Sequence, residues 1–176
     1  MRRNIIIILV AALLLAPWPI VYAWQGVNAD TAGNAASITP ADPSNAPQLK
    51  AYGNAVGSVT PGDLFQIDTT ATHVDTSYSL TITNINDLVS SYRFMNLKIG
   101  VFVESDNVTG KWQKLDEIDG QQFHDIYITM FGDKLDFTLP GGAMYKVTID
   151  TGCFYCYPVK PGKTIAVPAF YLATSS

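Results

Sequence analysis

The sequence predicts an all-β protein, an antiparallel β-sandwich of immunoglobulin-like or jelly-roll type with about seven or eight strands. Short stretches alternate between apolar and polar residues, turn signals rich in Gly, Pro and Asp separate them, and no long amphipathic helical pattern interrupts them. The 176-residue chain is 48% hydrophobic, which is enough for one buried core. Only 15% of its residues are charged, as is typical of extracellular β proteins.

The clearest strand signal is T-S-Y-S-L-T-I-T, residues 76–83. Tyr78, Leu80 and Ile82 lie on one side of this strand, and serine and threonine occupy the other side. Similar alternation predicts further strands over residues 64–70, 97–104 and 125–131, and a strand around Trp112.

Two neighbouring segments, 134–139 and 143–150, flank the turn residues P-G-G and predict a β-hairpin. A last strand is predicted over residues 164–172, with Pro168 at an edge or a bulge. One helical turn is expected within residues 86–96, where Asp87 could serve as its N-cap.

Residues 1–23 have the pattern of a signal peptide. A basic start, M-R-R-N, precedes twelve apolar residues, and Val21 and Ala23 fit the −3 and −1 positions, so cleavage after Ala23 is predicted. The alternative is an uncleaved membrane anchor, because residues 5–24 form an uncharged run of about the length that spans a bilayer. We therefore expect a secreted, extracellular or cell-surface protein that contacts the membrane only through this segment if it is uncleaved.

Residues 24–50 show no hydrophobic periodicity and are rich in Ala, Asn, Pro and Ser, so they predict a flexible arm before a β-sandwich domain at 51–176. Such an arm can be a simple spacer. It can also donate an extended segment to the open sheet edge of a neighbouring copy, which would make the protein self-associate.

The only two cysteines, Cys153 and Cys156, have C-x-x-C spacing. In an exported chain they predict a disulfide that closes a turn between two strands. A redox pair, a metal site, and cysteines that are unpaired or bonded between chains are the alternatives. The first would need a helix after Cys153, and the second would need another pair of soft ligands, and the sequence indicates neither.

Two kinds of binding site have candidate residues. Aromatic rings on which sugars could stack are those of Trp112, Tyr155 and Tyr157, with core packing as the alternative. Carboxylates that could bind calcium occur in two acidic clusters, with solvated loop charges as the alternative: Glu104, Asp106, Asp116 and Asp119. Asn107 begins N-V-T, which has the form of a glycosylation acceptor.

No catalytic residue is predicted. His73 and His124 each lie close to an aspartate, but the chain lacks the common nucleophile and zinc-protease motifs, so both are interpreted as surface residues. No cofactor is predicted, and calcium is the one alternative. A formal net charge of −4 without a basic patch argues against nucleic-acid binding.

The stretch T-P-G-D at 60–63, followed by S-L-T-I-T-N-I-N at 79–86, resembles the turn and strand pattern of secreted biofilm-fibre proteins of the camelysin type. The resemblance covers a few dozen residues. This chain lacks the turn that usually follows the T-N strand in that family, and the resemblance implies no site residues.

These observations predict an exported, non-catalytic structural or adhesive protein of the cell surface or extracellular matrix. It would act through sheet edges and loops, for instance as a filament or matrix subunit. One alternative is a carbohydrate- or calcium-dependent binding module that recognises surface glycans. A further alternative is an exported hydrolase or thiol-redox protein.

Overall fold

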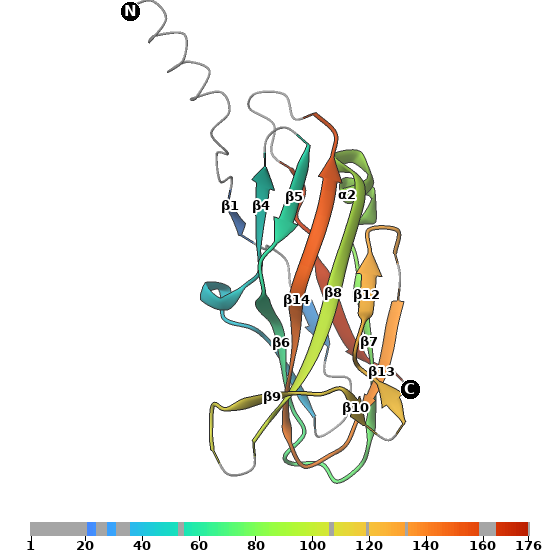
Figure 1. Cartoon of the computed structure of the whole chain (residues 1–176). Helices are drawn as coiled ribbons and strands as arrows, with labels where there is room; N and C mark the ends of the chain where they lie inside the picture. The colour runs from blue at the N-terminus through green and yellow to red at the C-terminus, as the bar shows by residue number, and fades with distance from the viewer. Residues whose placement is uncertain are drawn as a thin grey trace, which may run out of the picture.

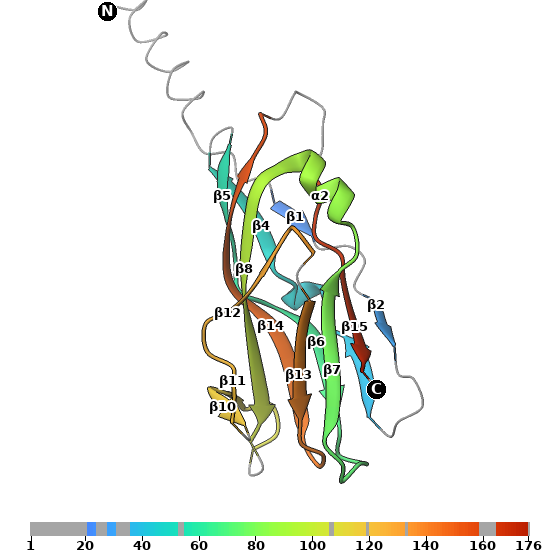
Figure 2. The ribbon, with the colours of Figure 1, turned by 90° about the vertical axis from the view of Figure 1, so that its right-hand side faces the viewer.

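The computed structural model describes residues 21–23, 28–30, 36–52, 55–105, 108–118, 120–132, 134–158 and 165–175. These residues form two β-sheets that pack face to face, as seen along the layers in Figure 2. One short α-helix lies at the upper end of the molecule in Figure 1. The predicted all-β sandwich is confirmed.

The larger sheet is built around two long central strands, β8 and β14, which pair antiparallel along almost their full length. On its other side β14 pairs first with β6 and then with β5, so the sheet divides into a β6–β3 branch and a β5–β4–β1 branch. Strands β9 and β12 pair with β8. The nine strands are β1 (Val21–Ala23), β3 (Ser37–Pro40), β4 (Gln48–Tyr52), β5 (Val56–Val59), β6 (Gly62–Asp68), β8 (Tyr92–Glu104), β9 (Trp112–Lys114), β12 (Ile126–Thr129) and β14 (Met144–Cys156).

The smaller sheet has four strands in the order β13 (Lys134–Leu139), β7 (Thr76–Ile82), β15 (Phe170–Thr174) and β2 (Asn28–Asp30). Its pairings are antiparallel except that of β2 with β15, which is parallel. The remaining elements are the 3-10 turn η1 (Pro43–Asn45), helix α2 (Ile85–Ser91) and a small hairpin of β10 (Glu117–Ile118) and β11 (Gln121–Gln122).

The core lies between the two sheets and is filled by one side of each strand. Tyr78, Leu80 and Ile82 are buried, as their spacing predicted. Tyr78 stacks on Phe137 of the adjacent strand β13, with the ring centroids 5.7 Å apart. The larger sheet supplies alternating residues from its central strands, including Leu97, Ile99, Val101, Val147 and Ile149.

The predicted hairpin of residues 134–150 is wrong. Strand β13 pairs with β7 in the smaller sheet, whereas β14 belongs to the larger sheet, so the two segments face each other across the core. Thr69 holds the corner between them: its hydroxyl donates to the carbonyl of Ala143 at 2.7 Å, and its carbonyl accepts from the amide of Gly142 at 2.8 Å. Alternation gave the buried side of each strand correctly, but it contains no information on which strand is the partner.

The prediction of a flexible arm is wrong for residues 36–50. Strand β3 pairs with β6, and β4 pairs with β5, both in the larger sheet. Ile38 and Leu49 are buried in the core. Residues 24–27 and 31–35 of the predicted arm lie outside the described residues, as do residues 1–20 of the predicted signal peptide.

Two smaller predictions also need correction. The last strand, β15, begins at Phe170, after Pro168, so this proline is not inside a strand. Helix α2 is present where a helical turn was expected, but its N-cap position is Asn84, and Asp87 lies in its first turn. The Asn84 side chain instead bonds the chain before β15, accepting from the amide of Ala169 at 2.8 Å and donating to the carbonyl of Val167 at 2.8 Å.

Candidate functional site

The two cysteines lie in the last four residues of β14 and are not joined by a disulfide. Cα atoms three residues apart in an extended strand are separated by roughly 10 Å, which exceeds the reach of a disulfide of about 7 Å. The odd spacing also turns the side chains to opposite faces, so Cys153 is exposed and Cys156 is buried. Burial raises the pKa of the Cys156 thiol, which keeps it protonated and unreactive at neutral pH.

The ring of Trp112 contacts a lysine of its own chain. Lys146 Nζ lies 5.1 Å from the centroid of the Trp112 ring and 5.2 Å from that of Phe102, and its ammonium pairs with Asp63 Oδ1 at 3.2 Å. This cation–π arrangement occupies one face of the indole. That face is therefore not available to a sugar ring while Lys146 keeps its position.

The other two aromatic candidates, Tyr155 and Tyr157, are 39% and 44% exposed and share one cation. Arg93 Cζ lies 5.3 Å from the Tyr155 ring centroid and 5.2 Å from that of Tyr157. Tyr155 is paired with Phe94, whereas Trp112 is paired with Glu104, ten residues further along β8. That separation is roughly 33 Å, so the three predicted sugar-stacking residues do not form one site.

The predicted calcium ligands are only partly described. Asp106, Asp119 and the predicted glycosylation residue Asn107 lie outside the described residues. Glu104 accepts a hydrogen bond from the backbone amide of Gly110, and Asp116 is exposed. Among the described residues no group of three or more acidic, histidine or cysteine side chains could hold a metal ion.

Both histidines, His73 and His124, are exposed. The aspartate beside His124 is engaged elsewhere, because Lys98 Nζ donates to Asp125 Oδ1 at 2.5 Å. This hydrogen bond lowers the pKa of Asp125 and raises the pKa of Lys98. The ion pair therefore exists at neutral pH and is lost as the pH falls through the lowered pKa of Asp125.

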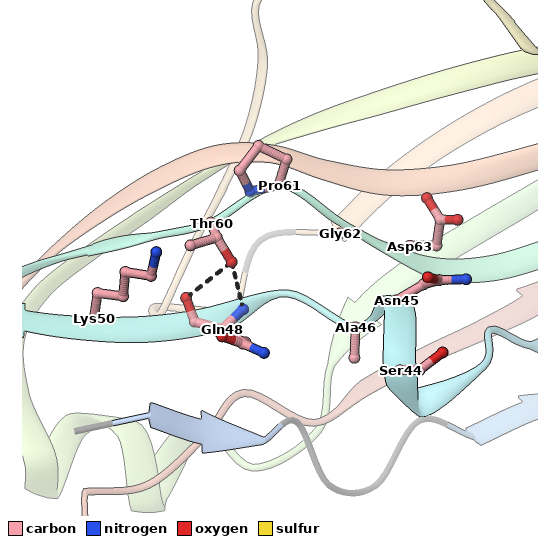
Figure 3. A pocket seen from close by; sticks show the side chains of 9 residues that line it. All are labelled: Ser44, Asn45, Ala46, Gln48, Lys50, Thr60, Pro61, Gly62 and Asp63. Atoms are coloured by element: carbon pink, nitrogen blue, oxygen red, sulfur yellow. Dashed lines mark hydrogen bonds between the residues drawn. The ribbon is translucent and has the colours of Figure 1, made fainter. Parts of the chain in front are cut away.

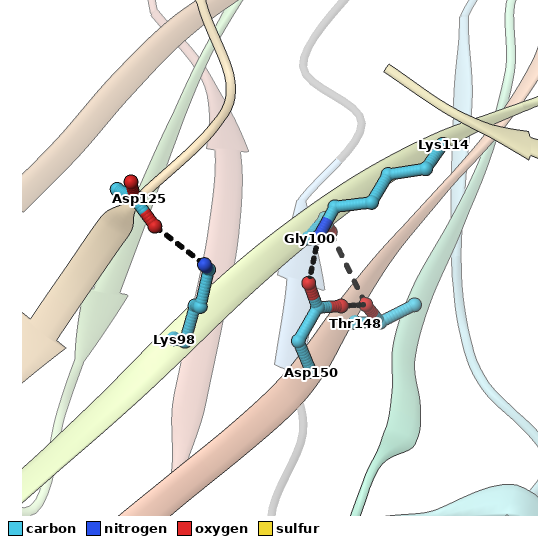
Figure 4. A network of polar contacts seen from close by, with 6 residues as sticks. All are labelled: Lys98, Gly100, Lys114, Asp125, Thr148 and Asp150. Atoms are coloured by element: carbon cyan, nitrogen blue, oxygen red, sulfur yellow. Dashed lines mark hydrogen bonds and ion pairs between the residues drawn. The ribbon is translucent and has the colours of Figure 1, made fainter. Parts of the chain in front are cut away.

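A second ion pair lies beside it on the outer face of the larger sheet (Figure 4). Lys114 pairs with Asp150, and the Thr148 hydroxyl donates to Asp150 Oδ1 at 2.9 Å. A Cβ on Gly100 would lie 2.2 Å from that oxygen, so glycine leaves the space that the carboxylate occupies. The charges join β8, β9, β12 and β14 and are satisfied by one another, which indicates a structural role.

A polar pocket of about 590 Å³ lies where the β5–β4 branch separates from β6 (Figure 3). Beside this pocket the backbone amide of Gln48 donates to Thr60 Oγ1 at 2.9 Å, and Gly62 packs against the backbone of Pro47. The side chains of Asn45, Gln48 and Lys50 face this space without a hydrogen bond or ion pair to another described residue. The lining residues are Ser44, Asn45, Ala46, Gln48, Lys50, Thr60, Pro61, Gly62 and Asp63.

The two edge strands of the four-stranded sheet are covered in different ways. At the β13 edge the side-chain amide of Gln121 imitates a neighbouring strand: its oxygen accepts from the backbone amide of Thr138 at 2.9 Å, and its nitrogen donates to the carbonyl of Asp136 at 3.4 Å. At the opposite edge β15 pairs with three residues of the N-terminal segment, β2. One edge is thus closed by a side chain and the other by a short strand from a distant part of the sequence.

Comparison with known proteins assigns no family. No protein-family model matches the chain, and no curated protein matches it at a significant level. In the described part of the chain, no helix has both the length and the apolar character needed to cross a membrane.

Sequence reasoning missed the pocket, the contact of Lys146 with Trp112 and the closing of the β13 edge by Gln121. Each joins residues that are distant in the sequence. No local signal existed for the cysteines either, because alternation continued from Val147 and Ile149 would bury Cys153. A register shift between Ile149 and Thr151 changes the phase of the strand, so that Phe154 and Cys156 are buried instead.

Proposed function

We propose that the protein is an exported, non-catalytic structural or adhesive subunit, of the kind found in extracellular filaments or matrices, that binds copies of itself through a sheet edge. The observation that supports this proposal is the parallel pairing of β2 with β15. It places a short segment from the region before the domain against the last strand of the sandwich.

Such a pairing depends on main-chain hydrogen bonds and can be made equally well by the same segment of a second copy. Three residue pairs join β2 to β15, from Asn28 to Asp30 of β2. The energy lost when β2 leaves its own β15 is regained when it pairs with a neighbour. An exchange of this kind generates an open chain of subunits if the geometry does not close.

The test is the size of the purified chain as a function of concentration, measured by light scattering after size-exclusion chromatography. We expect polymers that grow with concentration. The double substitution Ala29→Pro and Asp30→Pro should abolish them, because prolines remove the amide donors and do not fit a strand ladder.

The matched control is Ala32→Pro with Gly33→Pro, which makes the same change outside the paired residues and should leave the polymers intact. Monomers at all concentrations, or polymers unaffected by prolines at 29 and 30, would contradict the proposal. In that case the spacer interpretation of the N-terminal segment would be preferred.

A second candidate function is binding of a carbohydrate, and the polar pocket is the observation that favours it. Unpaired amides from Asn45 and Gln48 beside the ammonium of Lys50 match the hydroxyl groups of a saccharide. A glycan array distinguishes this site from the ring of Trp112: binding should be lost in Gln48→Ala and kept in Trp112→Ala. Absence of glycan binding with and without calcium would exclude both carbohydrate sites and the calcium-dependent module.

A further inference from the structure

The exposed large hydrophobic residues are concentrated at one end of the sandwich. Val56, Tyr155 and Phe94 are neighbours across β5, β14 and β8 in the strand register, and they are 50%, 39% and 42% exposed. Together they form an apolar row across three adjacent strands on the outer face of the larger sheet. Isolated exposed hydrophobic residues are ordinary, but a contiguous row of them marks an interaction surface.

Three more exposed hydrophobic side chains flank this row. Tyr157 follows β14, and its backbone amide donates to the carbonyl of Ser91 at 3.0 Å, which ties it to the end of α2. Val89 is on α2, and Phe131 follows β12 on the other side of β8. In Figure 1 α2 and the end of β14 lie at the upper end of the molecule, and β12 points toward the same end. We call Val56, Val89, Phe94, Phe131, Tyr155 and Tyr157, with Arg93, the tip surface.

The chemistry of the tip surface fits the boundary between lipid headgroups and acyl chains. Tyrosines have an apolar ring and a polar hydroxyl, and they are enriched at this boundary in membrane proteins. Arg93 lies between two of them, and an arginine can keep its charge at the level of the headgroups while its stem lies in apolar surroundings. Glu104 and Asp116 lie toward the other end of β8, away from this surface.

The direction of β1 also favours a lipid bilayer as the partner of the tip surface. In the pairing of β1 with β4, Val21 lies opposite Lys50 and Ala23 lies opposite Gln48. Tyr52, at the end of β4, pairs with Val56 of the tip surface. Val21 is therefore at the end of β1 that is nearer the tip surface. The sequence before β1 contains an uncharged, mainly apolar run at residues 5–20, which is slightly shorter than the roughly 20 residues of a helix that crosses a bilayer.

We propose that the tip surface rests on a lipid bilayer in the full-length chain, with its aromatic side chains at the depth of the headgroups and the long axis of the sandwich pointing away from the membrane. The proposal concerns the chain that retains its N-terminal apolar run, and it is independent of strand exchange at β15. It assigns a role to exposed residues that the self-association surface does not use.

A fluorescent label on Cys153 can measure whether the tip surface contacts the bilayer. The Cys153 side chain lies on the same exposed face of β14 as Tyr155, two residues away, while Cys156 is buried. A thiol-reactive fluorophore added to the native protein should therefore label Cys153. The full chain is reconstituted into vesicles of phosphatidylcholine and phosphatidylglycerol that contain lipids with a quenching group high on the acyl chain.

We expect strong quenching of the label at Cys153. A label at the opposite end, on Asp116→Cys in a Cys153→Ser background, should show at least about fivefold less quenching, because interfacial side chains lie within about 10 Å of the acyl boundary and this position is far above it. The double substitution Phe94→Ser and Tyr155→Ser should reduce quenching at Cys153 at least about threefold although the apolar run is unchanged.

The matched control is Tyr127→Ser, which removes an exposed aromatic ring from the same sheet outside the tip surface and should leave quenching unchanged. Weak quenching at Cys153 in protein that floats with the vesicles would overturn the proposal, as would equal quenching at both label positions. Vesicle-independent dimers cross-linked through Cys153 would show that a second copy covers this surface, and would also overturn it.

Discussion

At the scale of single residues, the position of the two cysteines in a β-strand determines whether they can form a disulfide. Spacing C-x-x-C favours a disulfide in a turn, but β14 continues through Cys156 as a strand. The alternation of a strand then separates the two thiols onto opposite faces. Cys153 is exposed to reagents, whereas burial raises the pKa of Cys156.

We therefore predict that iodoacetamide at neutral pH modifies one thiol per native chain and two per chain in denaturant. Mass spectrometry of peptides should locate the native modification at Cys153. The Cys156→Ala variant is the control, and its native labelling should equal that of the unsubstituted chain. A chain in which neither cysteine reacts until a reductant is added would instead contain the disulfide that the sequence favoured.

At the scale of elements, the exposed edge of β13 is closed without a strand. Unpaired backbone groups at a sheet edge invite the addition of another chain, and natural proteins cover such edges. Here Gln121, from the β10–β11 hairpin, satisfies the amide of Thr138 and the carbonyl of Asp136. The proposed self-association would therefore use the opposite edge of the sheet, where β15 pairs with β2.

Replacement of Gln121 by alanine should lower the free energy of unfolding by about 1 kcal/mol, because two hydrogen bonds to the β13 backbone are lost, of which the one from Thr138 is partly buried and the one to Asp136 is exposed. It should also speed hydrogen exchange at the amide of Thr138 and cause association at low concentration. Urea denaturation and exchange measured by NMR provide the two readouts. Gln122→Ala is the control, because the Gln122 side chain donates its hydrogen bond to Glu117 of the same hairpin. Equal effects of both substitutions would contradict an edge-closing role for Gln121.

At the scale of the whole molecule, the core extends into the part of the chain that looks unstructured in the sequence. Ile38 and Leu49 are 7% and 1% exposed, and each is on a strand at or near the edge of the larger sheet. Their segments read as linker because strands of four or five residues are too short to show periodicity among prolines and asparagines. The folded domain therefore includes residues 36–50.

Two truncated chains test this boundary. A chain of residues 36–176 should fold and unfold cooperatively, whereas a chain of residues 51–176 should lack fixed tertiary structure. Losing a buried Ile or Leu side chain costs about 2–5 kcal/mol, and whole domains are stable by only about 5–15 kcal/mol. Near-ultraviolet circular dichroism and thermal unfolding measure the difference. Cooperative unfolding of the shorter chain at a similar temperature would show that β3 and β4 are dispensable.

The sequence by itself determined the all-β class, the buried side of most strands and the exposure of both histidines, because these depend on alternation and composition, which are local. Only the tertiary structure decided which strands are partners, where the domain begins, that Lys146 covers one face of Trp112, and that Tyr155 and Trp112 lie at opposite ends. These depend on contacts between segments distant in the chain, and an alternating strand buries the same side chains against many different neighbours.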